Sequence, residues 1–397
     1  MKRKTKKGML IFLSVIIIFV AAKALWVVCA TSGYGSWDGE KKDIIRRANY
    51  LTAKVATSPQ DLLDEMPSAI GEQFQGEWAL YSCSMTCAAL ANIAILYPQN
   101  KDMSVKYIGE IIDIAMSEEI REYDKLRWKE DPMDGIYGDL SHISYYSHLA
   151  WMISRYKQIG GDGKYDGLYH SLCKAMNRRI RQSPYLNCKT YPGELVYIPD
   201  MLVAIVALHN YSRQYKGEYD TTVRMWIERA KNEWLDEETG LLASFLEAEN
   251  GITQIVKPVK GSYSALNCYY LSLIDPEFAK EQYECFIKHF KKSFPAAGIS
   301  EYHDSYTLLG MDIDAGPVVL NYSPSGTSFA LGAATSLGDT TFRKKLLNTI
   351  EIGGNTLTWF SKSHYMVSDL AVVAEAILLA MRTSAPETRV AGNVREE

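Results

Sequence analysis

The sequence of 397 residues lacks the short motifs that mark the commonest cofactor and metal sites. It contains no Rossmann glycine fingerprint, no phosphate-binding glycine loop, no EF-hand and no G-x-S-x-G nucleophile turn. Its seven cysteines include no C-x-x-C pair, and no Cys/His grouping has zinc spacing. These absences argue against dinucleotide, phosphate-loop, calcium, zinc and serine-hydrolase chemistry. We therefore expect neither a cofactor nor a metal.

Basic residues are scarce outside the N-terminus. Residues 1–30 carry six Lys/Arg and no acid, and the remainder carries 37 basic against 47 acidic side chains. A body this acidic lacks the electrostatic footprint of nucleic-acid binding, so we exclude that class of partner. Cys83 and Cys87, four residues apart on an expected helix, are interpreted as buried small hydrophobes rather than a disulfide.

The N-terminal segment is basic and then apolar. Residues 1–7 are rich in Lys and Arg, residues 9–22 are apolar, Lys23 interrupts, and residues 24–30 are apolar again. The basic flank predicts a cytoplasmic N-terminus, so the domain that follows lies outside the cytoplasm. An uncleaved anchor spanning the membrane is favoured, but the A-x-A pattern at 22–24 also fits a cleaved signal peptide. We expect an anchor or signal at 1–30, a linker at 31–41, one domain at 42–385 and a polar tail at 386–397.

The body is helical nearly throughout, because apolar residues recur with a 3.6-residue period between Gly, Pro, Asn and Asp breaks. Twelve helices are expected, near 42–56, 75–96, 103–121, 142–159, 165–182, 200–215, 220–235, 262–274, 276–293, 325–337, 340–351 and 363–382. Short strands near 241–246 and 253–256 could pair as a hairpin. Twelve helices in antiparallel pairs suggest an all-α fold, a closed ring of six helical hairpins or (α/α)6 barrel. An irregular multi-helix scaffold is the alternative.

The inner helices of such a ring leave a cavity at one end, where the longer connections gather. Four aromatic and acid-rich connections are assigned to this mouth: 128–142, 187–200, 242–263 and 295–324. Trp128 opens the first of them and is expected to line the substrate.

The segment 191–201 (Tyr-Pro-Gly-Glu-Leu-Val-Tyr-Ile-Pro-Asp-Met) places two acids and two phenols on a rigid backbone. Asp200 follows Pro199 and precedes an apolar helix, as a helix N-cap does, and its carboxylate would face the positive end of the helix dipole. In a bland interpretation Asp200 only caps the helix and Glu194 is solvated. The grouping favours a site in which Glu194, Asp200 and Tyr191 are catalytic and Tyr197 binds substrate.

Other candidates lie on neighbouring elements. His148 lies about two turns into the fourth helix and is expected to be catalytic, since a histidine of near-neutral pKa can carry protons. Tyr145, three residues earlier on the same face, is expected to bind substrate. Tyr263 precedes a buried helix and could donate a hydrogen bond into the cavity, although plain packing explains it equally well. Asp312 and Asp314 stand in a second proline-bounded acidic loop, where one is expected to line the site and one to brace the loop.

Several stretches in shared order resemble the linalool dehydratase/isomerase family, over roughly residues 125–345. The stretches are Tyr146-Ser-His148-Leu, the loop from Ser183 to Asp200, Tyr211-Ser-Arg213, Trp226, Trp234-Leu-Asp with Gly240, Lys257-Pro258, Ser262-Tyr263, Asp275-Pro-Glu-Phe278 and Gly310-Met-Asp312 through Gly338-Asp339. The resemblance implies an exported, cofactor-independent enzyme on an (α/α)6 barrel. It places His148 on the family's active-site histidine and Tyr263 on its active-site tyrosine.

The chain departs from that family at the centre of the site. Two cysteines that act in the family's chemistry, nine residues apart, correspond here to Tyr191 and Asp200. The family's early Asp and Tyr have no counterpart in residues 62–75. The departure therefore affects the reaction that the resemblance implies more than the fold that it implies.

Three functions remain open from the sequence. The first is a membrane-tethered extracytoplasmic lyase or isomerase that moves protons on a small hydroxylated substrate. The second is a glycoside hydrolase or other carbohydrate-active enzyme with Glu194 or Asp200 facing Asp312 or Asp314 at ~5–10 Å. The third is a ligand-binding scaffold without turnover.

Overall fold

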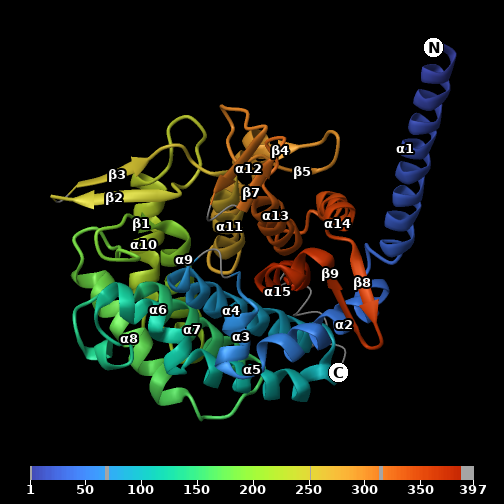
Figure 1. Ribbon diagram of the computed structural model, residues 1–397. Coiled ribbons are helices and arrows are strands. Elements are labelled where there is room, and N and C mark those ends of the chain that lie inside the picture. Colours follow the sequence, from blue (N-terminus) through green and yellow to red (C-terminus); the bar gives the residue numbers. More distant parts are fainter. Residues whose placement is uncertain (1, 68–70, 251, 313–315, 386–397) are drawn as a thin grey trace.

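A computed structural model of the chain describes residues 2–67, 71–250, 252–312 and 316–385, and it is mostly helical (Figure 1). The helices of this part are α1 (Lys2–Ala30), α2 (Trp37–Val55), α3 (Pro59–Asp64), α4 (Glu72–Leu96), α5 (Lys101–Ala115), α6 (Glu118–Trp128), α7 (Ile143–Gln158), α8 (Asp166–Gln182), α9 (Ile198–Gln214), α10 (Asp220–Glu233), α11 (Gly261–Ser272), α12 (Pro276–Phe290), α13 (Pro324–Ser336), α14 (Thr340–Gly354) and α15 (Val372–Thr383). The prediction of a predominantly helical fold is confirmed.

Short antiparallel strands join the helices. β1 (Val196–Tyr197), β2 (Phe245–Glu249) and β3 (Ile252–Val256) form a three-stranded sheet. Three two-stranded pairs follow: β4 (Lys291–Lys292) with β5 (Gly298–Ile299), β6 (Leu309–Asp312) with β7 (Gly316–Val319), and β8 (Thr356–Trp359) with β9 (Lys362–Tyr365). The predicted hairpin near 241–256 is present as β2 and β3.

Six helices contact one another in a closed cyclic order. α4 packs on α7, α7 on α9, α9 on α11, α11 on α13, α13 on α15, and α15 returns to α4. These six helices are apolar on most of their surface, as in the buried run 201–208 of α9, whereas outer helices such as α8 bury one stripe only. Each inner helix follows a connection from an outer helix. The starts of the inner helices are therefore where side chains from several elements can meet.

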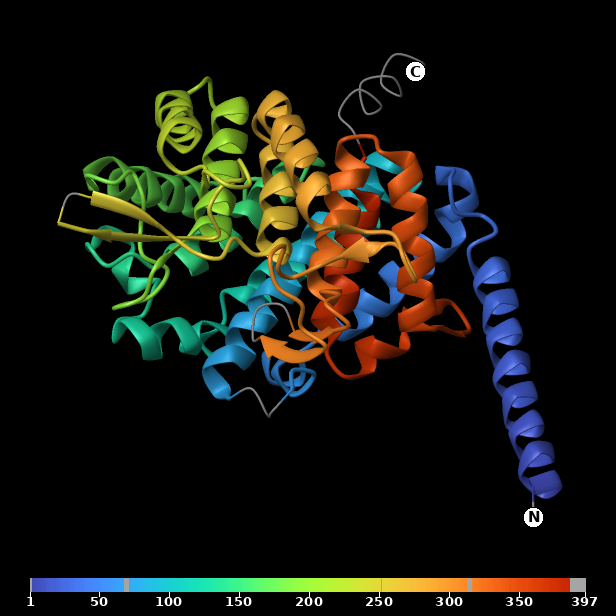
Figure 2. The same ribbon diagram turned by 90° about the horizontal axis from the view of Figure 1, so that it is seen from above.

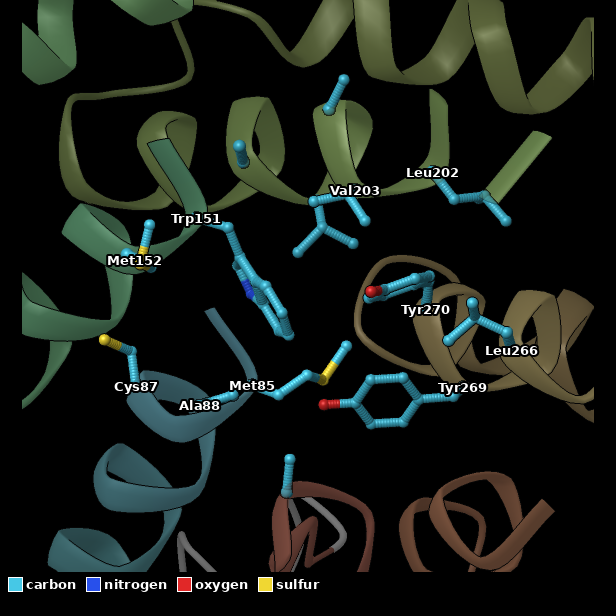
Figure 3. Packing of buried hydrophobic residues seen from close by; sticks show 14 of the residues in the cluster. Met85, Cys87, Ala88, Trp151, Met152, Leu202, Val203, Leu266, Tyr269 and Tyr270 are labelled. Carbon is cyan, nitrogen blue, oxygen red and sulfur yellow. The ribbon is translucent and has the colours of Figure 1, made fainter. Parts of the chain in front are cut away.

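The centre of this ring is filled with side chains (Figure 3). Trp151 of α7 meets Tyr270 of α11 edge to face with ring centroids 5.7 Å apart, and Met85 of α4 and Tyr269 of α11 lie beside them. All four are buried. Because Trp151 lies one helical turn beyond His148, this cluster forms an apolar floor under the polar groups described below.

A buried ion network joins α2, α14 and α15. The Glu40 carboxylate accepts hydrogen bonds from Arg343 at 2.7 and 2.8 Å and from Arg382 at 2.7 Å, and Glu40 is fully buried. Arg47 of α2 bonds Glu375 of α15 at 2.7 Å. These paired charges fix α2 against the last two helices. Loss of one partner would leave a buried charge without a compensating group.

Two helices among the described residues are long and apolar enough to cross a membrane. One covers Phe12–Ala30 of α1 and is 6% buried, and the other covers Phe74–Leu96 of α4 and is 78% buried. The second is one of the six helices of the ring and is mostly buried, so its apolarity is explained by the core. α1 instead leaves the body (Figure 1), held at its C-terminal end where Trp26 donates to Glu351 at 3.0 Å and Lys23 donates to the Glu351 carbonyl at 3.2 Å.

Several predicted boundaries were wrong. α2 begins at Trp37, because Ser36 caps it by accepting from the Gly39 amide at 3.1 Å, so the expected linker 31–41 is shorter. The expected helix 103–121 is two helices, since Ser117 caps α6. The expected helix 363–382 begins only at Val372, because β8 and β9 occupy 356–365. The predicted tail 386–397 lies outside the described residues.

Candidate functional site

Asp200 lies in the first turn of α9 rather than at its N-cap. The helix begins at Ile198 with Tyr197 as N-cap, because Pro199, which lacks an N–H, fits the first helical positions without losing a hydrogen bond. The prediction that Asp200 caps the helix was therefore wrong. Its carboxylate still lies at the positive end of the helix dipole, which favours a negative charge there.

Three tyrosines from three elements interact electrostatically with Asp200, and two of them, Tyr191 and Tyr270, are buried while Tyr81 is partly buried. Tyr81 belongs to α4, Tyr191 to the loop before α9 and Tyr270 to α11. Burial raises the pKa of each phenol, and the negative charge of Asp200 raises each of the three further. All three phenols are thus protonated near neutral pH and available as hydrogen-bond donors to a ligand oxygen.

The hydroxyls of these tyrosines are buried and make no hydrogen bond of ordinary geometry within the described part of the chain, although those of Tyr81 and Tyr270 interact with each other. The Tyr123 hydroxyl of α6 is in the same state, and it shares with Tyr191 the neighbours Glu77 and Ser144. Folding normally pairs such groups, because an unsatisfied buried donor costs about 1–3 kcal/mol. Three of the four interact with the Asp200 carboxylate, so this group of phenols offers hydrogen-bond donors to an oxygen-bearing ligand or to ordered water.

His148 adjoins this group but is unsuited to proton transfer at neutral pH. Its Nδ1 lies 2.8 Å from the Ser84 hydroxyl, and its ring meets Tyr81 edge to face at 5.0 Å. Burial without a counter-charge lowers the pKa of His148 to about 3. The imidazole is therefore neutral, so the proton-carrying role expected from an ordinary histidine is not supported. His148 can instead orient Tyr81.

Glu194 is partly exposed and lies three residues after Tyr191 in the same loop. Its carboxylate accepts from Arg127 at 3.1 Å and from the Tyr197 hydroxyl at 3.2 Å, and its side chain is 38% exposed. Arg127 also reaches Glu77 at 3.6 Å and lies over the Tyr191 ring, 3.7 Å from its centroid. A carboxylate held by an arginine in this way is a loop brace, so the expected catalytic role of Glu194 is not supported by its surroundings.

Tyr263 and Tyr197 form an aromatic cluster with Phe245. Tyr263 opens α11 and is buried, and Phe245 of β2 contacts both phenol rings at centroid distances of 4.9 Å. The two phenols lie 6.5 Å apart, with the Lys260 ammonium 5.6 Å from the centroid of the Tyr263 ring. Tyr197 therefore connects Tyr263 to Glu194.

An aspartate–histidine pair that sequence reasoning missed lies next to Trp128. His142 is buried in the left-handed region at φ 46°, and its Nδ1 hydrogen-bonds the buried Asp124 carboxylate. Burial raises the pKa of Asp124. The Trp128 ring lies 5.4 Å from His142, so Trp128 packs on this pair. His142 therefore has a strained backbone conformation at the start of α7. Such strain persists only where the surrounding contacts hold the residue in place.

The remaining predicted residues are less central. Tyr145 is buried and donates its hydroxyl to the Ala115 carbonyl at 3.0 Å, so it is a core residue rather than a substrate ligand. Asp312 ends β6, and Asp314 lies outside the described residues. All seven cysteines are free, and Cys83 and Cys87 are buried, as interpreted from the sequence.

The described surface hollows lie elsewhere. One of about 370 Å³ is bounded by Tyr50, Asp61 and Trp359, and another of about 700 Å³ by Lys42 and Phe360. Both flank α2 and the β8–β9 hairpin, where no convergent unpaired polar groups occur among their lining residues. We place the site at Asp200 on its chemistry. The described residues contain no cluster of three His, Cys, Asp or Glu side chains that could hold a metal ion.

Neither known protein families nor curated protein sequences match the chain. Among solved structures, an alpha-amylase from Clostridium perfringens is similar at 12% sequence identity and a TM-score of 0.42. The similarity covers 74% of this chain and 85% of that one. A TM-score this low establishes neither a shared fold nor a shared activity.

Proposed function

We propose that the protein is a membrane-tethered, extracytoplasmic (α/α)6-barrel enzyme that acts as an acid/base lyase or isomerase on a hydroxylated small molecule. The cyclic contacts of α4, α7, α9, α11, α13 and α15 support the barrel. The exposed apolar helix α1, preceded by basic residues, supports a membrane anchor with the domain outside the cytoplasm. The resemblance to the linalool dehydratase/isomerase family supports the reaction class.

The observation that carries the proposed chemistry is the grouping of Asp200 with three protonated phenols whose hydroxyls are buried. Loss of water from an alcohol needs a donor at the departing hydroxyl and a base for the proton lost from carbon. In this proposal the hydroxyl of Tyr81 or Tyr191 donates to the leaving oxygen and Asp200 removes the proton. The products are the alkene and water. The proton that Asp200 removed from carbon then passes through water to the tyrosine oxygen, which restores both the phenol and the carboxylate.

The surroundings of these groups suit such a reaction. In this proposal the apolar floor of Trp151 and Met85 keeps bulk water from the reacting centre and offers an apolar contact to the hydrocarbon part of a substrate bound above it. The site supplies acid and base from Asp200 and the tyrosines, so no cofactor is required in this proposal.

The proposal is tested with linalool and a set of other allylic alcohols in water enriched in ¹⁸O. Reversible dehydration is expected to give an alkene and to place ¹⁸O in the recovered alcohol, both followed by mass spectrometry. If neither product nor exchange is found with any alcohol, the dehydration chemistry is wrong. Release of reducing sugar from an oligosaccharide would instead support the carbohydrate-active alternative.

A further inference from the structure

The β6–β7 hairpin carries an apolar outer face. Leu309 pairs with Val319 and Met311 with Pro317, so these four side chains share one face, while Val318 points the other way and is buried. Leu309 is 76% exposed and Met311 80%. An exposed hairpin face without a polar residue is unusual, because solvent-facing strands normally carry charges that prevent association.

Further exposed apolar side chains lie on the chain segments next to the hairpin and in the β4–β5 loop. The further residues are Phe294, Tyr306, Leu308 and Leu320, and Phe294 is 86% exposed. The Leu320 amide donates to the Leu308 carbonyl at 2.7 Å, which joins the two ends of the hairpin. We call these residues, with Leu309, Met311, Pro317 and Val319, the apolar hairpin face.

A positive charge lies at the edge of the face. Lys292 donates to the Leu320 carbonyl at 3.1 Å, and its ammonium is 5.6 Å from the centroid of the Tyr306 ring. Tyrosine and lysine together at the border of an apolar surface are the combination found where proteins meet the headgroups of a bilayer.

The β6–β7 hairpin lies on the side of the body toward which α1 runs (Figure 2). In Figure 1 α1 runs upward beside the half of the body that holds β4, β5 and β7. In Figure 2 α1 runs toward the lower edge, where the β6–β7 hairpin also lies, and α15 ends at the opposite edge. The contacts of Lys23 and Trp26 with Glu351 hold the direction of α1 relative to the body.

We infer that the apolar hairpin face rests on the outer surface of the membrane that α1 spans. This inference depends on the membrane anchoring in the proposed function, but not on the reaction. The occupant is the interfacial layer of a phospholipid bilayer. Each exposed side chain covered by lipid contributes about 25 cal/mol per Å² of apolar surface removed from water, so several such residues are enough to hold the body in one orientation.

The test uses the full chain with Cys29→Ser and Cys285→Ala, reconstituted into vesicles of phosphatidylcholine and phosphatidylglycerol. One variant adds Met311→Cys on the face, and a control adds Thr341→Cys, an exposed position in the first turn of α14. Each new thiol carries an NBD fluorophore, and a parallel sample contains brominated acyl chains. We expect blue-shifted emission and quenching by brominated lipid at 311 and neither effect at 341.

Three results would overturn the inference. If the dye at 311 keeps the emission it has in water and is not quenched, while the protein floats with the vesicles, the face does not contact the membrane. Equal quenching at 311 and 341 assigns the signal to the dye. Failure to float removes the anchor itself. Loss of alcohol turnover with an intact labelling pattern counts against the proposed reaction alone.

Discussion

Arg127 lies flat against Tyr191, with its guanidinium carbon 3.7 Å from the centroid of the ring. The same guanidinium bonds Glu194 at 3.1 Å and approaches Glu77 of α4. One side chain of α6 therefore ties the loop before α9 to α4. We expect the position of the Tyr191 phenol to depend on this bridge, since Arg127 contacts both the Tyr191 ring and Glu194 of the same loop.

Arg127→Gln is therefore expected to lower both the melting temperature and turnover, because the loop that holds Tyr191 loses its bridge and two acids lose their partner. Glu194→Gln is the matched control. Its ion pair is partly solvated, so the change should cost less than about 1 kcal/mol of unfolding free energy and leave turnover close to that of the wild type. Urea unfolding and alcohol turnover measure both variants. A larger loss of turnover in Glu194→Gln than in Arg127→Gln would contradict the brace.

Tyr191→Phe is expected to lower turnover while leaving the free energy of unfolding unchanged or up to ~1 kcal/mol higher, because it removes a buried hydroxyl that has no hydrogen-bond partner among the described residues. Tyr145→Phe provides the contrast. Its hydroxyl donates to the Ala115 carbonyl, so its loss should cost about 1–3 kcal/mol without affecting turnover. If Tyr191 had a structural partner, urea unfolding would show a larger loss of stability for Tyr191→Phe than for Tyr145→Phe.

His148 predicts a specific dependence of stability on pH. Burial lowers the pKa of His148 from 6.5 to about 3, so between these values the unfolded chain binds a proton that the folded chain does not. Stability is therefore lost as the pH falls through this window, at up to ~1.4 kcal/mol per pH unit for this group. His148→Asn should remove that contribution, whereas Ser84→Ala, which keeps the histidine, should retain it. Identical pH slopes for wild type and His148→Asn in urea unfolding would show that the histidine is not buried neutral.

The helical class and most of the helices could be predicted from periodicity, because buried inner helices such as α9 leave long apolar stretches between turn residues. Boundaries set by single hydrogen bonds, such as the Ser117 cap that divides α5 from α6, were less visible. The 363–382 segment was misassigned because the apolar residues of 366–371 (Met-Val-Ser-Asp-Leu-Ala) extend the apolar pattern of α15 towards β9.

The site was predictable only where it is local in sequence. The loop 191–200 could be singled out because its acids, phenols and prolines are adjacent. Tyr81 and Tyr270 could not, since each lies in an apolar helix where an aromatic residue normally packs, and only the ring brings them to Asp200. The partner of His142, Asp124, is eighteen residues away in the preceding helix. The bridge of Arg127 to Glu194, across sixty-seven residues, likewise depends on tertiary structure.

The most direct test of the proposed site compares Asp200→Asn with Glu194→Gln in the ¹⁸O assay on one alcohol that the wild type exchanges. Asp200→Asn keeps the shape of the side chain but removes the base, so exchange and alkene formation are predicted to fall on the order of 10²–10⁴-fold, while Glu194→Gln stays near the wild-type rate. Asp200→Asn that exchanges ¹⁸O at the wild-type rate, with its fold intact, would contradict the account.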